Sequence, residues 1–292
     1  MLIIDYLQTN TAAFLSLSFV LGLLIGSFLN VVILRLPVMM QRDWRKQCHE
    51  LLETPDKDNQ ETETPYNLNT PRSQCPKCKH QITVLENIPV LSFLFLRGKC
   101  SNCKTPISPR YALIELLSGL LTLAVAWHFG FGWAAGAAML LTWALIALSF
   151  IDIDTQMLPD DITLPLLWLG LILSLVPIFV GTSTSIIGAA SGYLSLWVVF
   201  HIFRLVTGKE GMGYGDFKLL AVFGAWLGWQ LLPVVILLSS AVGAVVGITM
   251  ILVLGRDRNI PIPFGPYLAA AGWLAMMWGQ DINNAYLSYS GL

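Results

Sequence analysis

Residues 116–151 read LLSGLLTLAVAWHFGFGWAAGAAMLLTWALIALSFI and contain no Asp, Glu, Lys or Arg. A helix needs about 20 apolar residues to cross a membrane, so this block is long enough for two helices. Its central Phe129-Gly130-Phe131-Gly132 favours a turn between them. We therefore expect a helical hairpin that crosses a membrane twice.

Four other blocks without charged residues resemble this one, at residues 6–34, 162–203, 219–255 and 259–280. By the same length rule, blocks 6–34 and 259–280 hold one span each, and blocks 162–203 and 219–255 hold two spans each. Only 12% of the chain is charged and 55% is hydrophobic, about half the charge expected of a soluble domain. The pattern predicts an all-α polytopic membrane protein with about eight transmembrane helices.

The basic residues indicate how these spans are oriented. Lys and Arg accumulate in short cytoplasmic loops, and all 17 follow the first, fifth or seventh expected span. A buried soluble core would not produce this one-sided distribution. No basic residue precedes the first apolar run, which is also too long for a cleavable signal peptide. We expect a periplasmic N-terminus, and the net charge of −1 gives no sign of nucleic-acid binding.

The only large polar region lies after the first span. We therefore expect three parts, namely a first transmembrane helix at 1–36, a cytoplasmic loop domain at 37–110 and a seven-helix membrane domain at 111–292. Within the loop, residues 54–65 have the composition of a flexible linker. Residues 87–99 are too short to span and too apolar for an open loop. They are expected in the membrane interface or packed beneath the helices.

Two C-x-x-C motifs lie in this loop. Together they supply four thiolates for a tetrahedral zinc ion, from Cys75, Cys78, Cys100 and Cys103. Disulfides would require an oxidising compartment, and a redox-active pair would not need a second copy. The sequence predicts one structural Zn²⁺ per chain, with His80 as the nearest alternative ligand and Cys48 as a spare thiol.

Two aspartates stand at the ends of apolar runs, where ionisable groups are costly without a partner or a function. Asp152 ends the block quoted above, and Asp216 closes the turn Gly213-Tyr214-Gly215-Asp216. The expected topology puts both on the cytoplasmic face, where two carboxyls could share a proton as in aspartic proteases. Proton or ion transport and simple helix capping are the alternatives. Capping suits Asp216, at a helix start, better than Asp152, at a helix end.

In combination these motifs resemble the type 4 prepilin peptidases, which are GxGD aspartic proteases of the membrane. The resemblance extends over nearly the whole chain and includes GSFLNVVILRLP at 26–37, both cysteine pairs, 107–111, 150–160, 213–218 and IPFGPY at 262–267. The GxGD motif alone is shared with presenilin-like proteases. Its combination with the cysteines and the N-terminal motif is specific.

The resemblance implies a bifunctional enzyme of the bacterial inner membrane. It implies cleavage of type IV prepilins and type II secretion pseudopilins after a glycine, at the cytoplasmic face. The new N-terminal residue, usually phenylalanine, is then N-methylated from S-adenosylmethionine. The catalytic residues would be Asp152 and Asp216, supported by Gly213 and Gly215. Asp154 is the rival of Asp152 within Asp152-Ile153-Asp154. The related archaeal preflagellin peptidases retain the acid that matches Asp152, which favours that residue.

The methyl-donor site is harder to place, because no Rossmann-type glycine fingerprint is present. We expect it at the zinc-bearing loop, at Gly98 and Lys99 with Glu115 nearby. The competing function is a proton-coupled transporter that uses the two aspartates as a relay, which would place acids nearer the bilayer centre. An assembly scaffold built on the zinc loop would leave the aspartates unexplained.

Overall fold

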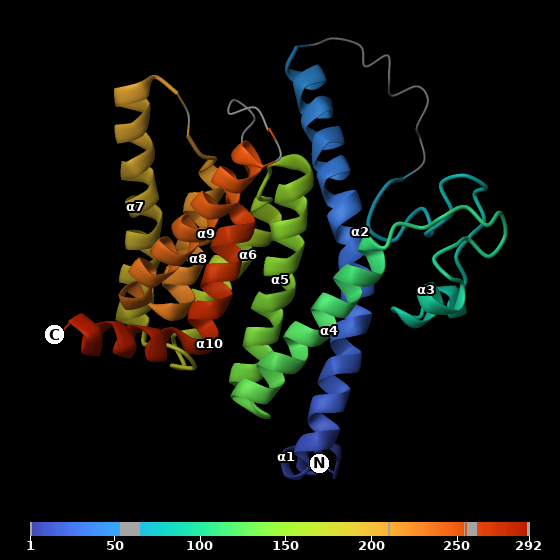
Figure 1. Ribbon diagram of the computed structural model, residues 1–292, viewed down its shortest axis with the longest axis horizontal. Helices are drawn as coiled ribbons and strands as arrows, with labels where there is room; N and C mark the ends of the chain where they lie inside the picture. The colour runs from blue at the N-terminus through green and yellow to red at the C-terminus, as the bar shows by residue number, and fades with distance from the viewer. Residues whose placement is uncertain (1, 53–64, 210, 254, 256–261, 291–292) are drawn as a thin grey trace. The chain divides into compact units, whose positions relative to one another are not determined.

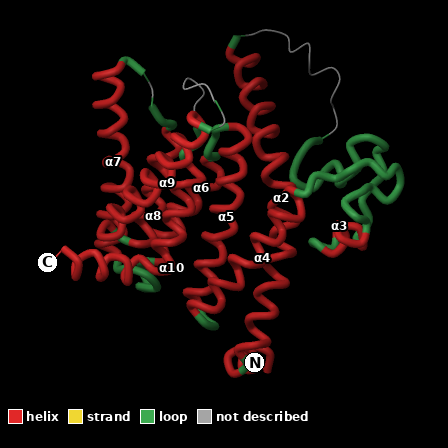
Figure 2. The backbone as a smooth tube through the Cα atoms, in the orientation of Figure 1, coloured by secondary structure: helices red, strands yellow, loops and turns green. Residues whose placement is uncertain are grey.

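The computed structural model describes residues 2–52, 65–209, 211–253, 255 and 262–290. Figures 1 and 2 show an all-helical chain, and its described residues contain only two isolated β-bridges. The chain divides into two compact units, Met1–Phe131 and Gly132–Leu292, which are described separately. The linker expected at 54–65 lies, up to residue 64, outside the described residues.

The first unit contains a long helix packed along a shorter one. Helix α1 (Leu2–Thr9) precedes α2 (Thr11–Leu51), which packs along α4 (Arg110–Phe129). At about 1.5 Å per residue, the 41-residue α2 is roughly 61 Å long, twice the thickness of a bilayer core. It does not end at residue 36 as expected. Its polar continuation is rich in helix-forming Gln, Arg, Lys, Glu and Leu, so the helix extends into the loop region.

The loop between α2 and α4 contains two short helical segments, η2 (Leu85–Asn87) and α3 (Leu91–Phe95). Glycines allow α2 to approach α4 closely beneath this loop. A Cβ on Gly26 would lie 2.7 Å from the Cα of Glu115, and one on Gly22 would lie 2.6 Å from the Thr122 hydroxyl. Small residues of this kind bring membrane helices into backbone contact.

The second unit is a bundle around a buried helix. Its helices are α5 (Trp133–Thr155), α6 (Asp160–Leu173), α7 (Thr182–Thr207), α8 (Tyr214–Leu227), η3 (Trp229–Leu231), α9 (Leu232–Leu252) and α10 (Gly265–Ser290). Helix α8 contacts α6, α7, α9 and α10, and all but one of its residues from 216 to 227 are buried. A helix that is apolar on all sides belongs in such a position.

Polar side chains and glycines fix α8 to its neighbours. The Trp226 indole N–H donates to the Leu166 carbonyl of α6 at 2.9 Å, and the Ser185 hydroxyl of α7 donates to the Ala225 carbonyl at 2.7 Å. At the α7–α8 crossing, a Cβ on Gly188 would overlap the carbonyl of Gly224, and the reverse also holds. This crossing therefore requires two residues without side chains.

Helix α10 bends near the end of the chain. Trp278 has non-helical dihedrals (φ −133°, ψ 16°), and Figure 1 shows the last part of the helix running across the direction of the first. Before the bend, the Trp273 indole N–H donates to the Thr142 hydroxyl of α5 at 3.0 Å. The part of α10 before the bend is thereby held against α5, whereas the part after Trp278 runs in a different direction.

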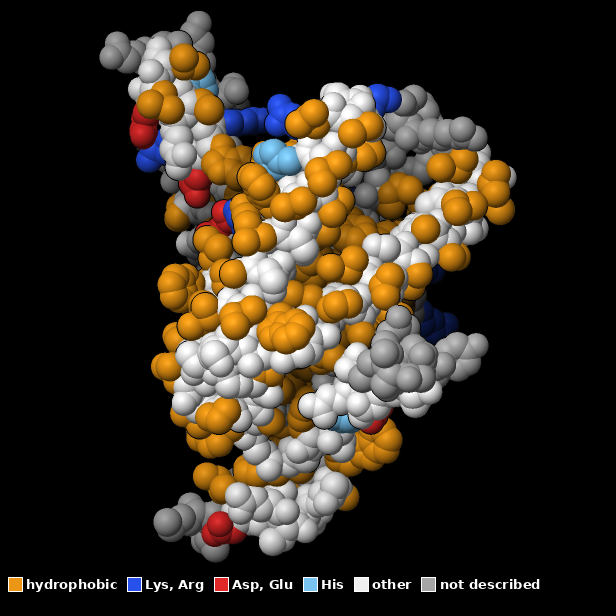
Figure 3. All heavy atoms as spheres, turned by 90° about the vertical axis from the view of Figure 1, so that its left-hand side faces the viewer, with side chains coloured by type: hydrophobic (Ala, Val, Ile, Leu, Met, Phe, Trp, Pro, Cys, Tyr) orange, Lys and Arg blue, Asp and Glu red, His pale blue; other side chains and the backbone are white. Residues whose placement is uncertain are grey.

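Eight helices occupy the stretches where spans were expected, but their lengths differ. Among the described residues, five helices are long and apolar enough to cross a membrane: α2, α4, α5, α7 and Trp229–Leu252. Helices α6 and α8 have 14 residues each, about 21 Å. The eight crossings therefore stay a prediction. Much of the face shown in Figure 3 is hydrophobic, as expected for contact with lipid.

The glycine crossing gives a stability test. Gly188→Ala should lower the free energy of unfolding by about 1–3 kcal/mol, because the new methyl group meets backbone that cannot rotate away. Gly136→Ala in α5 is the control, since a Cβ there meets nothing within 4 Å. Thermal unfolding in detergent would compare them. Equal melting temperatures for the two variants would contradict the close crossing.

Candidate active site and metal centre

Asp152 lies in the last turn of α5 and is only 5% exposed. Its Oδ2 accepts a hydrogen bond from the backbone N–H of Gly265 at 2.9 Å, and Gly265 is the first residue of α10. A carboxylate at the end of its own helix is disfavoured by the helix dipole. The positive N-terminus of α10 offsets that effect. Residue 265 must be glycine, because a Cβ there would lie 2.7 Å from Asp152 Oδ2.

Asp216 lies in the first turn of α8 and is also 5% exposed. Its carboxylate is hydrogen-bonded to the backbone of Gly213, and it is close enough to Asp152 for the two charges to interact. Leu158 touches both halves of the site. A Cβ on Gly215 would lie 2.7 Å from Leu158 Cβ, and one on Gly265 would lie 3.1 Å from its Cδ2. The structure thus brings two buried acids from separate helices together.

The other acids of these motifs are placed differently. Asp154 is exposed, so it does not join the buried pair. Asp160, in the first turn of α6, forms an ion pair with Lys218 of α8, with Nζ–O distances of 2.6 and 2.7 Å. Lys218 is two residues beyond Asp216, and the ion pair therefore connects the start of α6 to the turn that holds this acid.

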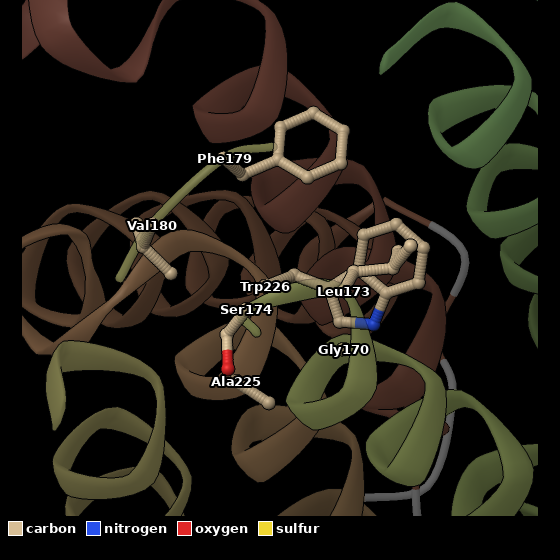
Figure 4. A pocket seen from close by; sticks show the side chains of 7 residues that line it. All are labelled: Gly170, Leu173, Ser174, Phe179, Val180, Ala225 and Trp226. Carbon is tan, nitrogen blue, oxygen red and sulfur yellow. The ribbon is translucent and has the colours of Figure 1, made fainter. Parts of the chain in front are cut away.

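A small apolar pocket occurs at the other end of α8 (Figure 4). Trp226 and Phe179 lie beside it, with the remaining lining from Gly170, Leu173, Ser174, Val180 and Ala225. The space does not admit a water molecule, and no ionisable side chain lines it. Trp226 is ten residues from Asp216, about 15 Å along the helix. This pocket therefore takes no part in the acidic site.

The four predicted cysteines form one cluster in the first unit. Their sulfur atoms all lie within 4.8 Å of one another, with Cys75–Cys103 at 3.7 Å and Cys78–Cys100 at 3.9 Å. Four sulfurs around a tetrahedral zinc at 2.3 Å would be about 3.8 Å apart. The donor set and its spacing fit such an ion. Cys48 is exposed on α2 and is separate from the cluster.

The two halves of the cluster have the same backbone geometry. Cys75 N donates to His80 O and Cys100 N donates to Thr105 O, each at 2.9 Å. Lys79 and Lys104, each following a second cysteine, have φ of 59° and 58°. Hydrogen bonds with the side chain and backbone of Thr105 lower the pKa of the Cys103 thiol to about 6.

The thiols of the cluster differ in this preference: hydrogen bonds with the backbone of Cys78 and Lys77 also lower the pKa of Cys75. The pKa of Cys78 rises to about 11, because burial and the neighbouring sulfurs outweigh a hydrogen bond with the His80 backbone. A bound cation would let all four sulfurs be thiolates at neutral pH. His80 itself is engaged elsewhere, with Nε2 3.3 Å from both carboxylate oxygens of Glu86.

Each residue expected at the methyl-donor site has a distinct position. Gly98 has φ +66°, and a Cβ on it would lie 3.0 Å from the ring of Phe93. Lys99 is exposed. Glu115 Oε2 accepts the backbone N–H of Val90 at 2.8 Å. Gly98 and Glu115 therefore have roles within the loop itself, and Lys99 is the most accessible of the three.

Comparison with known proteins identifies the family. The Bacterial Peptidase A24 N-terminal domain matches residues 20–129, and the Type IV leader peptidase family matches residues 139–248. The chain is 57% identical to the prepilin leader peptidase/N-methyltransferase of Stutzerimonas stutzeri and 55% identical to that of Pseudomonas aeruginosa, over 99% of both chains in each case. The Aeromonas hydrophila protein of the same name is 57% identical over 94% of both chains. The chain belongs to the type IV leader peptidase family. No solved structure is a significant match.

The two family matches correspond to the two candidate sites. The match to the Bacterial Peptidase A24 N-terminal domain contains all four cysteines, and the match to the Type IV leader peptidase family contains Asp152 and Asp216. Gly265 lies beyond both matches, although it completes the hydrogen bonding of Asp152.

Sequence reasoning missed three contributors to the acidic site. The stretch at 262–267 was noted as a family resemblance, but nothing local revealed that its glycine donates to Asp152. Leu158 lies in the stretch 150–160 that carries the family resemblance, but its contacts with two glycines depend on the fold. The spacing of Asp160 and Lys218, 58 residues apart, also gives no hint of their ion pair.

The ion pair permits a test of how α6 is held to α8. Its side chains are 51% and 28% exposed, so the coupling energy should be modest, about 0.2–1 kcal/mol. A double-mutant cycle with Asp160→Asn and Lys218→Met, followed by unfolding in detergent, measures this coupling. A coupling above about 3 kcal/mol would instead indicate a pair shielded from solvent.

Proposed function

We propose that Asp152 and Asp216 are the catalytic carboxyls with which this prepilin leader peptidase/N-methyltransferase cleaves its substrates. The activity follows from relatives of that name, which this chain matches over nearly their whole length. The observation that supports the residue assignment is the pairing of two buried acids from separate helices within the matched family region. Exposed Asp154 fits this role less well.

The chemistry that this pair can perform is hydrolysis by an activated water. One carboxylate accepts a proton from water as the water attacks the scissile carbonyl. The protonated partner donates its proton to the developing oxyanion. The first carboxyl then passes the proton taken from water to the leaving amine, and the partner regains its own proton as the tetrahedral intermediate collapses. Because the two groups interact, they titrate as a unit. Gly265 orients Asp152 through its N–H, and Gly213 does the same for Asp216.

The proposed substrates are type IV prepilins and type II secretion pseudopilins, cut after a glycine. The new N-terminal residue, usually phenylalanine, then accepts a methyl group from S-adenosylmethionine. Asp152 lies at the C-terminus of α5 and Asp216 at the N-terminus of α8. We place both of these helix ends at the cytoplasmic face of the bacterial inner membrane. A basic leader peptide would then reach them from the cytosol.

We further propose that all eight helices cross the membrane, with the N-terminus in the periplasm. Helices α6 and α8 fall short of the roughly 30 Å core by about a third. Their ends lie beside Phe179 and Val180, which line the pocket next to Trp226 (Figure 4). The described basic residues lie in the C-terminal part of α2, in the loop after it, at the start of α4, at the end of α7 or just after it, and near the start of α8, and this distribution supports the proposed cytoplasmic loops.

The assignment of Asp152 and Asp216 as catalytic residues predicts a clear mutational result. Asp152→Asn and Asp216→Asn should each reduce cleavage at least about 100-fold, because an amide cannot exchange the proton. Asp154→Asn is the matched control and should stay near the parent rate. Purified protein would be incubated with a prepilin and the product mass measured. Loss of activity in Asp154→Asn with an active Asp152→Asn would move the first catalytic position by two residues.

The cysteine cluster is proposed to hold one structural zinc per chain, which joins the two halves of the loop. Metal analysis of the purified protein should find about one zinc. Cys75→Ser and Cys103→Ser should each lose most of it, whereas Cys48→Ser should retain it because Cys48 lies apart. Full zinc content in both ligand variants would exclude a four-thiolate site.

The methyl donor is proposed to bind at the zinc-bearing loop near Gly98 and Lys99, with Glu115 in support. Of these, Lys99 offers the cleanest test, because Gly98 and Glu115 also maintain the loop. Lys99→Ala should lower methylation about tenfold, a loss of about 1.4 kcal/mol, and leave cleavage nearly unchanged. Lys77→Ala, at an exposed lysine of the first C-x-x-C, is the control. Equal effects on both activities would remove Lys99 from the donor site.

A further inference from the structure

Short helix α3 exposes large apolar side chains on one side. Leu91, Leu94 and Phe95 follow helical spacing and are 52%, 63% and 84% exposed, and we call them the outer face of α3. Phe93, on the other side, packs against Gly98 within the loop. Three large hydrophobic side chains are thus uncovered on a segment that is otherwise folded against its own loop.

We infer that the outer face of α3 inserts into the lipid interface of the membrane beside α4. This inference rests on the chain being a multi-pass membrane protein of its family and does not depend on the catalytic assignment. Its support comes from the depth at which the loop is fixed, from the surface that adjoins it and from the charges that follow it.

The depth of α3 is set by Glu115. The carboxylate of this residue accepts the N–H of Val90, immediately before α3, at 2.8 Å. Glu115 is five residues inside α4 from Arg110, about 7.5 Å along the helix. Arg110 is the last charged residue before Glu115 and marks the polar end of the apolar run. Helix α3 therefore begins on the hydrocarbon side of that boundary, at the depth where interfacial helices lie.

A second contact holds the loop to α2 nearer the polar end of that helix. The Arg35 guanidinium donates to the carbonyls of Asn67, Leu68 and Pro71 at 2.9, 3.3 and 2.7 Å. Arg35 is five residues beyond Asn30, whose side-chain amide donates to the Tyr111 carbonyl of α4. The loop is thereby tied to both α2 and α4 and cannot rise freely into the aqueous phase.

Lipid fits this position better than a soluble partner. Leu113 and Leu116 flank Glu115 on α4 and are 57% and 42% exposed, so they form part of the apolar surface of a spanning helix. Leu91, the first residue of the outer face of α3, directly follows Val90, whose N–H is bonded to Glu115 between these two leucines. Arg97 and Lys99 follow α3 and are exposed, and cations at such a point favour anionic headgroups. The occupant is therefore the anionic lipid interface.

Photocrosslinking tests this location directly. A diazirine analogue of phenylalanine replaces Phe95 in the full chain, which is reconstituted in nanodiscs of zwitterionic and anionic phospholipid and irradiated. Mass spectrometry should find at least about tenfold more lipid adduct than with the same analogue at exposed Lys77. Equal adducts at the two positions, or adducts at 95 only with water or protein, would overturn the inference.

Two variants separate this result from the catalytic proposal. Glu115→Gln keeps the size of the side chain but weakens acceptance of the Val90 N–H, and lipid adduct at position 95 should fall severalfold if the depth depends on it. Asp152→Asn should leave the adduct unchanged even if cleavage is lost. Unchanged adduct in Glu115→Gln would show that this carboxylate does not set the depth of α3.

Discussion

Two carboxyl groups buried in an apolar bundle must be supplied with donors by the protein itself. The structure meets this constraint with helix N-termini. Asp216 opens α8, and Asp152, at the end of α5, faces the first N–H of α10. The positions of three helices are therefore linked by the electrostatic needs of two side chains. Helix α8 lies at the centre, where α6, α7 and α10 exclude solvent from it.

Much of this arrangement was visible in the sequence, for local reasons. The apolar lengths predicted helices at the observed places, and the spacing of the cysteines predicted one cluster. Both aspartates stood out because charge is rare in such runs. Other features depend on contacts between distant segments. Asp152 and Gly265 are 113 residues apart, and no local pattern pairs them. The first transmembrane segment was expected to end at residue 36, where the polarity changes, but the helix itself continues past Pro37 because the residues beyond it favour a helix.

The loop between α2 and α4 gives structural contacts to residues that were expected near the methyl donor. Glu115 was expected close to that site, beside the zinc-bearing loop. The structure gives its carboxylate a backbone partner at Val90, where the N–H precedes a short helix. Gly98 similarly has a steric reason to be glycine, with φ +66° and the Phe93 ring against it. Lys99 contributes its backbone to a bridge with Pro106, and the residue is exposed.

The bond from Gly265 to Asp152 also orders events during biosynthesis. A ribosome makes both aspartates well before it makes residue 265, which opens α10. Until then the acid of α5 lacks its backbone donor, and the pair is not held in its final geometry. A nascent chain arrested before α10 would thus possess both acids without a finished site. Insertion of α10 is the step that completes the centre.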